Sequence, residues 1–322
     1  MTQKLGAVDI PATAGIPSAS PRKQAIEDWI PAFTGITGYT GDNGAWIRKE
    51  DMDMNFKGKV VAITGGGSGI GEACVREFAG RNAAVAVVDC KAGAGENTIS
   101  ELRQGGATVE YFHADVSSGA AVERLVPAIV ARLGGIDVLV NNAGTQRYGS
   151  ATTTSEEEWD EVMNINLKSA FLMSKYAIPE MVKRGGGAIV MTGSVQSLTA
   201  QRNSIAYVVS KHGMLGLTRS IALDYGKQNI RANCVLPGAI DTPLLRWAVS
   251  LDSDPEKVLA NCDSLHIRGK MGRPEEVARV IAFLASDLAS FVTGAAYAVD
   301  GGLLVPTGGM PSQESGTGSK KA

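Results

Sequence analysis

Cysteine and histidine are scarce in this chain, which has 4 cysteines and 3 histidines among its 322 residues. The cysteines are Cys74, Cys90, Cys234 and Cys262, and no two of them form a Cys-x-x-Cys pair. This spacing is not that of a zinc site or of a disulfide framework. We therefore expect no metal centre, and we expect a reducing, cytoplasmic environment.

The sequence also lacks long apolar runs and any strong excess of charge. Its apolar stretches have the length of strands, which excludes a membrane-spanning helix and predicts a protein with no membrane partner. The first ten residues contain no positively charged segment followed by an apolar one, so we expect no secretory signal. The net charge is −2 and basic residues occur at most in pairs, which argues against nucleic acid as a partner.

Two terminal segments differ in composition from the rest of the chain. Residues 1–55 contain repeated proline and glycine and no long periodic segment, and they are interpreted as an extended or partly disordered arm. Residues 306–322 are rich in glycine, serine and lysine and are interpreted as a flexible tail. The predicted folded domain therefore spans residues 56–305.

Within that domain, short apolar runs alternate with longer segments of helical periodicity. Fully apolar runs of this length are typical of strands in a parallel sheet that helices cover on both faces. We predict one doubly wound α/β domain, a Rossmann fold with a seven-stranded parallel sheet, which binds its ligands at the carboxyl ends of the strands. The predicted strands are residues 60–63, 83–88, 109–112, 136–140, 188–191, 232–236 and 295–299.

A glycine-rich turn follows the first predicted strand directly. It runs Thr64-Gly65-Gly66-Gly67-Ser68-Gly69-Ile70-Gly71 and opens a helix. Glycines let the backbone of such a turn approach a pyrophosphate, and the helix N-terminus offers free N–H groups and a partial positive charge. A flexible surface loop is the alternative, but the order of strand, turn and helix favours dinucleotide binding.

Asp89 ends the second predicted strand, at the position where a dinucleotide site needs an acid. A carboxylate there accepts hydrogen bonds from the adenosine ribose and repels a 2′-phosphate. Residues 66–68 contain no lysine or arginine to neutralise such a phosphate, although Lys91 follows closely. NAD is therefore predicted as the cofactor over NADP, with a solvated strand-end carboxylate as the alternative.

The candidate catalytic groups are a tyrosine, a lysine and a serine. Tyr207 and Lys211 are four residues apart and so share one face of a predicted helix. A neighbouring ammonium favours the phenolate, so we expect Lys211 to lower the pKa of Tyr207 and make it a usable acid or base. Ser194 follows a predicted strand, and its hydroxyl can form a hydrogen bond with a substrate oxygen. An exposed Tyr–Lys pair is the alternative interpretation.

Together with Asn141-Asn142-Ala143-Gly144 and Pro237-Gly238, these motifs resemble the short-chain dehydrogenase/reductase family over about residues 56–305. The resemblance implies that Tyr207 is the acid/base, that Lys211 binds the nicotinamide ribose, and that Ser194 orients the substrate oxygen. It also implies that Asn166 holds a water in the proton relay. One departure is Gly193, because many members have a serine before the catalytic serine.

The residues predicted to bind the cofactor lie in the glycine turn, after the second, third, fourth and sixth strands, and on the catalytic helix. They are Thr64, Gly65, Gly67, Ser68, Gly69, Ile70, Gly71, Asp89, Asp115, Val116, Asn142, Ala143, Gly144, Tyr207, Lys211, Pro237, Gly238, Ile240 and Thr242. The resemblance further implies a homotetramer with helices around 156–183 and 206–226 at its interfaces, where Gly213 and Gly216 would permit close approach.

The substrate is expected under the polar loop of residues 241–273, in which His266 is interpreted as a loop residue. The polar residues that flank the expected mouth are Gln146, Arg147, Tyr148, Gln196, Gln201 and Asn203. Hydrogen-bonding groups of this kind suit a sugar or polyol. The segments Ser210–His212, Gly216–Tyr225 and Ile240–Leu244 resemble aldose dehydrogenases that produce a lactone by oxidation at C1. The alternatives are a reductase of ketones or 3-oxoacyl groups, and a cofactor-binding scaffold without turnover, which the complete catalytic set argues against.

Overall fold

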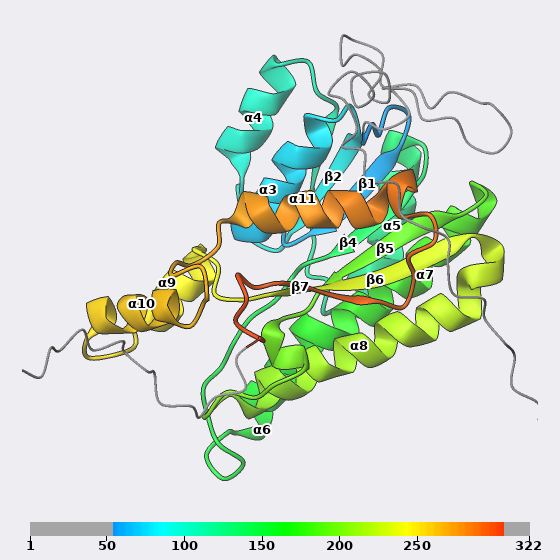
Figure 1. The fold of residues 1–322 in the computed structure, drawn as a ribbon. Coiled ribbons are helices and arrows are strands. Elements are labelled where there is room, and N and C mark those ends of the chain that lie inside the picture. The colour runs from blue at the N-terminus through cyan, green and yellow to red at the C-terminus, as the bar shows by residue number, and fades with distance from the viewer. Residues whose placement is uncertain (1–53, 306–322) are drawn as a thin grey trace, which may run out of the picture. The chain divides into compact units, whose positions relative to one another are not determined.

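The computed structural model describes residues 54–305, which form a seven-stranded parallel sheet in the order β3-β2-β1-β4-β5-β6-β7 (Figure 1). The predicted doubly wound α/β fold is therefore confirmed for this part of the chain. The predicted arm, apart from its last two residues, and the predicted tail lie outside the described residues.

All seven predicted strands are present, and their ends differ from the predicted ones by at most two residues. The strands are β1 (Val60–Thr64), β2 (Ala84–Asp89), β3 (Val109–His113), β4 (Val138–Asn141), β5 (Gly187–Thr192), β6 (Ile230–Pro237) and β7 (Ala296–Val299). Their apolar runs explain the outcome, because both faces of each central strand are buried.

Helices follow the strands along the chain. They are α3 (Gly69–Ala79), α4 (Glu96–Gln104), α5 (Gly119–Leu133), α6 (Glu156–Met163), α7 (Ser169–Lys183), α8 (Ile205–Tyr225), α9 (Pro243–Val249), α10 (Pro255–Ser264) and α11 (Pro274–Ala285). Four short turns are η1, a π-helical turn (Asn164–Lys168), and the 3₁₀ turns η2 (Val195–Ser197), η3 (Gly226–Gln228) and η4 (Asp287–Ala289). Among the helices of residues 54–305, none is long and apolar enough to cross a membrane.

The two faces of the sheet belong to two hydrophobic layers. On β1, Val60 and Ala62 pack in the layer that contains α5, α7 and α8, whereas Val61 and Ile63 pack in the layer that contains α3 and α11. This division follows from the alternation of side chains along a strand. Figure 1 shows α3 and α11 crossing one side of the sheet and α8 running along the other.

The strand order reverses between β1 and β4, because β1 continues to β2 on one side and β4 continues to β5 on the other. In an open parallel sheet, a crevice forms outside the carboxyl ends of the strands at such a reversal. The glycine turn after β1 and residues 142–144 after β4 both lie there. The topology therefore places two of the predicted motifs next to each other.

At the amino ends of the strands, Asp137, the residue before β4, connects β4 to β1 and to Arg184. Its carboxylate accepts hydrogen bonds from the backbone N–H of Val60 at 2.7 Å and from the Arg184 guanidinium at 2.8 and 2.9 Å. The Asp137 side chain is only 8% exposed. It therefore satisfies a buried backbone donor and a partly buried cation together.

We expect Asp137→Ala to lower the free energy of unfolding by about 3 kcal/mol, because it leaves the buried Val60 N–H without its acceptor and Arg184 without its carboxylate partner. Urea denaturation followed by circular dichroism measures this. Lys183→Ala is the matched control, because it breaks the exposed ion pair with Glu180 and should cost less than about 1 kcal/mol. Equal losses in the two variants would contradict this account of Asp137.

Candidate active site

The backbone conformation of the turn after β1 requires glycines, because of its positive φ angles and its close backbone contacts. Gly65 and Gly69 have φ angles of 61° and 55°, which other residues rarely adopt. A Cβ atom on Gly71 would collide with the carbonyl oxygen of Gly65. The N-terminus of α3 therefore lies against bare backbone, and a cradle of this kind fits a dinucleotide pyrophosphate.

Thr64 and Asn142 join this turn to the end of β4. The Thr64 hydroxyl accepts hydrogen bonds from the N–H groups of Asn142 at 3.0 Å and Ala143 at 3.1 Å. The Asn142 amide donates to the carbonyl oxygens of Thr64 at 3.1 Å and Gly65 at 3.2 Å. The side chains of these two predicted cofactor residues thus shape the crevice, since their polar groups are used within the protein.

Asp89 ends β2 beside the same turn. One carboxylate oxygen accepts a hydrogen bond from the N–H of Gly67 at 3.0 Å, and the other accepts from the N–H of Lys91 at 3.0 Å. A Cβ on Gly67 would lie 2.9 Å from the Asp89 carboxylate. The acid is therefore fixed beside the glycine turn, and its contact with the adenosine ribose stays a prediction.

Asp115 and Val116 follow β3 at the same edge of the sheet. The Asp115 carboxylate accepts hydrogen bonds from the backbone and hydroxyl of Ser117. Val116 is 7% exposed and packs in the core. The turn between β3 and α5 is thereby held in place beside Asp89, whose carbonyl oxygen accepts from the Ala114 N–H at 3.0 Å.

The remaining predicted cofactor residues come from the segment after β6. Pro237 is the last residue of β6, and Gly238 donates a hydrogen bond to the carbonyl of Val299 at 3.2 Å. Ile240 is buried and pairs with Gly272. The Thr242 side chain would touch a Cβ placed on Gly69, at 3.2 Å. The segment therefore extends from the sheet to the glycine turn.

Ser194, Tyr207 and Lys211 meet beside this segment, as the sequence predicts. Ser194 follows β5 and begins η2, where its hydroxyl accepts a hydrogen bond from the Gln196 N–H at 3.1 Å. Tyr207 and Lys211 lie on α8, and the Lys211 ammonium nitrogen is 5.4 Å from the centre of the Tyr207 ring. That nitrogen donates to the carbonyl oxygen of Thr192 at 2.7 Å, a partner that the sequence does not reveal.

The structure does not show the lowered pKa of Tyr207 that the sequence predicts. Burial raises the pKa of Tyr207 to about 12, and a hydrogen bond with the Ser194 hydroxyl only partly offsets it. Burial also lowers the pKa of Lys211 to about 8. Both shifts have one cause, because desolvation disfavours the phenolate as well as the ammonium. Lys211 remains mostly charged at neutral pH.

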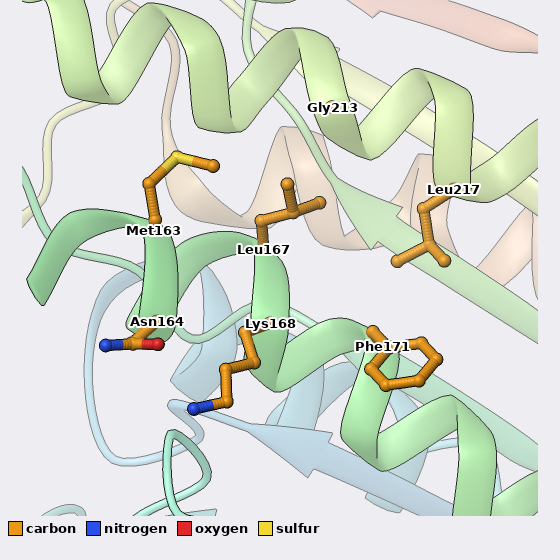
Figure 2. A pocket seen from close by; sticks show the side chains of 7 residues that line it. All are labelled: Met163, Asn164, Leu167, Lys168, Phe171, Gly213 and Leu217. Atoms are coloured by element: carbon orange, nitrogen blue, oxygen red, sulfur yellow. The ribbon is translucent and has the colours of Figure 1, made fainter. Parts of the chain in front are cut away.

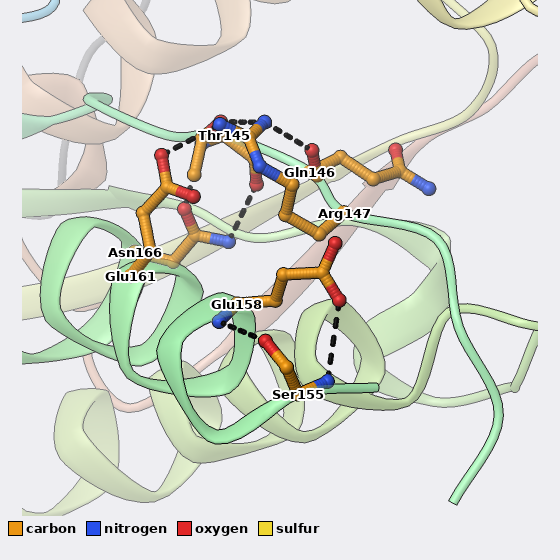
Figure 3. A network of polar contacts seen from close by, with 7 residues as sticks. All are labelled: Thr145, Gln146, Arg147, Ser155, Glu158, Glu161 and Asn166. Atoms are coloured by element: carbon orange, nitrogen blue, oxygen red, sulfur yellow. Dashed lines mark hydrogen bonds and ion pairs between the residues drawn. The ribbon is translucent and has the colours of Figure 1, made fainter. Parts of the chain in front are cut away.

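Asn166 lies in the π-helical turn η1, which interrupts the predicted helical run. It is fully buried and its amide exchanges hydrogen bonds with the backbone of Thr145, at 2.8 and 3.0 Å. It also donates to the Ser210 hydroxyl on α8 at 3.0 Å. Figure 3 shows the Asn166 amide pointing at Thr145. Asn166 therefore joins the loop after β4 to α8, and π-helical turns often mark functional sites.

The mouth of the site is more ordered than the predicted polar loop. Residues 241–273 contain α9 and α10, which begin at Pro243 and Pro255 and have Thr242 and Asp254 as their N-capping residues. An N-capping residue followed by proline is a helix start signal in the sequence. Of the flanking residues, Arg147 is paired with Glu161 at 2.7 Å (Figure 3). Its guanidinium carbon also lies 5.9 Å from the centre of the Trp247 ring on α9.

A cradle for a dinucleotide beside a Ser–Tyr–Lys group defines a nicotinamide-dependent oxidoreductase. The comparisons agree: residues 65–304 match the family model described as Enoyl-(Acyl carrier protein) reductase. An uncharacterized oxidoreductase of Thermotoga maritima is 42% identical, over 77% of this chain and 98% of its own length. A 2,5-dichloro-2,5-cyclohexadiene-1,4-diol dehydrogenase of Sphingobium indicum is 40% identical, over 77% and 98%.

Solved structures show the same relationship. The ligand-free aldohexose dehydrogenase of Thermoplasma acidophilum is 37% identical, with a TM-score of 0.72 over 80% of this chain and 98% of that one. The chain belongs to the short-chain dehydrogenase/reductase family. It is an oxidoreductase that acts on CH–OH groups, and members of this family use nicotinamide cofactors.

Proposed function

We propose that this protein is an NAD-dependent dehydrogenase that oxidises a hydroxyl on a six-membered ring, with an aldose oxidised at C1 to a lactone as the first candidate. The observation that supports the reaction is the meeting of Ser194, Tyr207 and Lys211 at the carboxyl edge of the sheet, beside the glycine turn. Nicotinamide supplies the hydride acceptor when it is bound.

Each of the three side chains has a separate task in this reaction. The Ser194 hydroxyl holds the substrate oxygen, and Tyr207 takes the hydroxyl proton as the carbonyl forms. Lys211 keeps a positive charge near the phenol, with its ammonium fixed by the Thr192 carbonyl, and it would reach the nicotinamide ribose. Burial opposes the phenolate in this structure, and we propose that the charge of Lys211 offsets part of this effect when cofactor and substrate are bound.

The substrate proposal is supported by the mixed character of the mouth. Trp247 and Tyr148 are each 38% exposed, and such rings suit the apolar face of a cyclic substrate. Within residues 54–305, the Gln196 side-chain oxygen is buried without a hydrogen-bond partner. A buried acceptor of this kind is stabilised by a donor such as a substrate hydroxyl. The relative named as an aldohexose dehydrogenase supports the same class.

A second candidate is the reduction of a ketone or a 3-oxoacyl group, which is supported by a relative from Thermotoga maritima that is named a 3-oxoacyl-[acyl-carrier-protein] reductase and is 37% identical over 78% of this chain. One assay separates the candidates. The purified protein is incubated with NAD or NADP and a panel of aldoses and cyclic alcohols, and with NADH or NADPH and cyclic ketones and 3-oxoacyl thioesters. Nicotinamide absorbance reports turnover. Turnover of thioesters alone would overturn the sugar proposal.

Tyr207→Phe should lower turnover by about 10² to 10⁴, because it removes the proton acceptor and keeps the ring. Binding of NAD, measured by fluorescence titration, should change little. Tyr225→Phe, at the far end of α8, is the matched control and should be near normal. Near-normal turnover in the Tyr207 variant would remove this residue from the mechanism.

The wild-type rate of alcohol oxidation should rise with pH, because the phenolate is the active form and burial raises the pKa of Tyr207. Lys211→Met should weaken NAD binding, measured by fluorescence titration, and lower turnover at neutral pH, because Lys211 is mostly charged there and is proposed to reach the nicotinamide ribose.

We also propose that Asp89 makes NAD the preferred cofactor. Its carboxylate, which the Gly67 N–H holds beside the glycine turn, would accept hydrogen bonds from the adenosine ribose and repel a 2′-phosphate. Asp89→Ala should weaken NAD binding by about tenfold or more and improve NADP relative to NAD. Titration of both dinucleotides measures this, with Glu101→Ala, an exposed acid on α4, as the control. A wild type that prefers NADP would refute the electrostatic argument.

The homotetramer remains a proposal, supported by an apolar hollow of about 410 Å³ between η1, α7 and α8. Figure 2 shows Phe171 and Leu217 facing each other across it, while Leu167 points toward Gly213. A Cβ on Gly213 would lie 2.6 Å from Leu167, so the close approach at Gly213 is made within one chain. Gly216, in contrast, has nothing within 4 Å of such a Cβ.

Phe171 is 50% exposed, and we expect Phe171→Asp to reduce the assembly to half its mass or less, because a charge would be buried between subunits. Light scattering at micromolar concentration measures the mass. Leu251→Asp places the same charge on an exposed leucine after α9 and should leave the mass unchanged. A monomeric wild type would contradict the tetramer.

A further inference from the structure

His266 is a buried histidine that the catalytic mechanism does not use. It follows α10, is 3% exposed, and has a partner on each ring nitrogen. Nδ1 lies 2.8 Å from the carbonyl oxygen of Cys262, and Nε2 lies 3.1 Å from the backbone nitrogen of Ala239. The ring therefore connects the end of α10 to the segment after β6.

These two partners determine which nitrogen carries the proton. A carbonyl oxygen can only accept, so Nδ1 must donate to Cys262. A backbone N–H can only donate, so Nε2 must be unprotonated to accept from Ala239. Two glycines leave room for the ring, because a Cβ on Gly238 would lie 2.7 Å from Nε2 and one on Gly301 would lie 3.3 Å from the His266 Cβ.

The segment that His266 holds is otherwise fixed by backbone contacts. Gly272 donates to the Ala239 carbonyl at 3.0 Å, and Asp241 donates to the Gly272 carbonyl at 2.9 Å. His266 adds the acceptor for the N–H of Ala239. Three residues further on, Thr242 lies against Gly69 of the glycine turn. A shift at Ala239 would therefore move the part of the crevice between the catalytic groups and the turn.

We propose that His266 is a positioning residue for the nicotinamide half of the cofactor. The neutral imidazole sets the backbone of Gly238–Ile240, and it touches neither substrate nor cofactor. This inference rests on the proposed function, because it assumes that nicotinamide binds along this segment. It predicts that loss of the Nε2 acceptor weakens binding of the nicotinamide half and spares the adenosine half.

The proposal is tested by replacing His266 with two amide side chains of different length, glutamine and asparagine. His266→Gln can place its side-chain oxygen where Nε2 lies and so keep the acceptor for Ala239. His266→Asn can still donate to Cys262, but it is too short to reach Ala239. Leu265→Ala, which removes an exposed side chain next to His266, is the control. Each variant is titrated with NADH and with ADP-ribose, which lacks nicotinamide, and its thermal midpoint is recorded.

His266→Asn should weaken NADH by about tenfold while ADP-ribose changes by less than about twofold, because a buried N–H is left without its acceptor. His266→Gln and the control should bind both ligands as the wild type does. The proposal is overturned if His266→Asn binds NADH normally, if it loses both ligands equally, or if His266→Gln behaves like His266→Asn. A wild type that binds ADP-ribose but no nicotinamide dinucleotide would overturn the proposed function itself.

Discussion

The candidate site depends on the hydrogen bonds of Thr64 and Asn142, which join the glycine turn after β1 to the end of β4. A parallel sheet that reverses its strand order leaves a crevice between the two diverging strands. Here a threonine hydroxyl and an asparagine amide bridge that crevice at its floor, with four contacts of 3.0 to 3.2 Å. Without them, the carbonyl oxygens of the glycine turn would need other partners, and the turn would lose its fixed shape.

The same arrangement explains why so much of the site consists of backbone. The cradle uses glycines at φ angles near 60°, the Lys211 ammonium is fixed by the Thr192 carbonyl, and Asn166 holds both backbone groups of Thr145. Side chains in this site mostly orient main-chain groups, which are rigid and carry strong dipoles. Ser194, Tyr207 and Lys211 are the side chains that we propose act on a substrate.

The strands and the site motifs could be predicted because they depend on local sequence. Fully apolar runs predict buried parallel strands, and the glycine turn and Tyr207–Lys211 spacing depend on positions a few residues apart. The helices α9 and α10 could also have been predicted from Thr242-Pro243 and Asp254-Pro255. The cytoplasmic location and the roles of the terminal segments stay predictions.

Other properties depend on distant parts of the chain and could not be predicted. The pKa of Tyr207 is set by burial in the folded protein. The buried state of His266 depends on Ala239, which lies 27 residues away in sequence. The π-helical turn at Asn166 depends on Thr145 and Ser210, which belong to other elements.

That π-helical turn has a consequence for how this protein can change. Each residue of an α-helix rotates the chain by about 100°, so the wider turn at Asn164–Lys168 sets the phase between α6 and α7. The same turn points Asn166 inward to α8 and contributes Leu167 to the apolar hollow beside Phe171. A single deletion that made the helix regular would therefore disturb the candidate site and this outer surface together, so the two cannot evolve independently through changes in helix length.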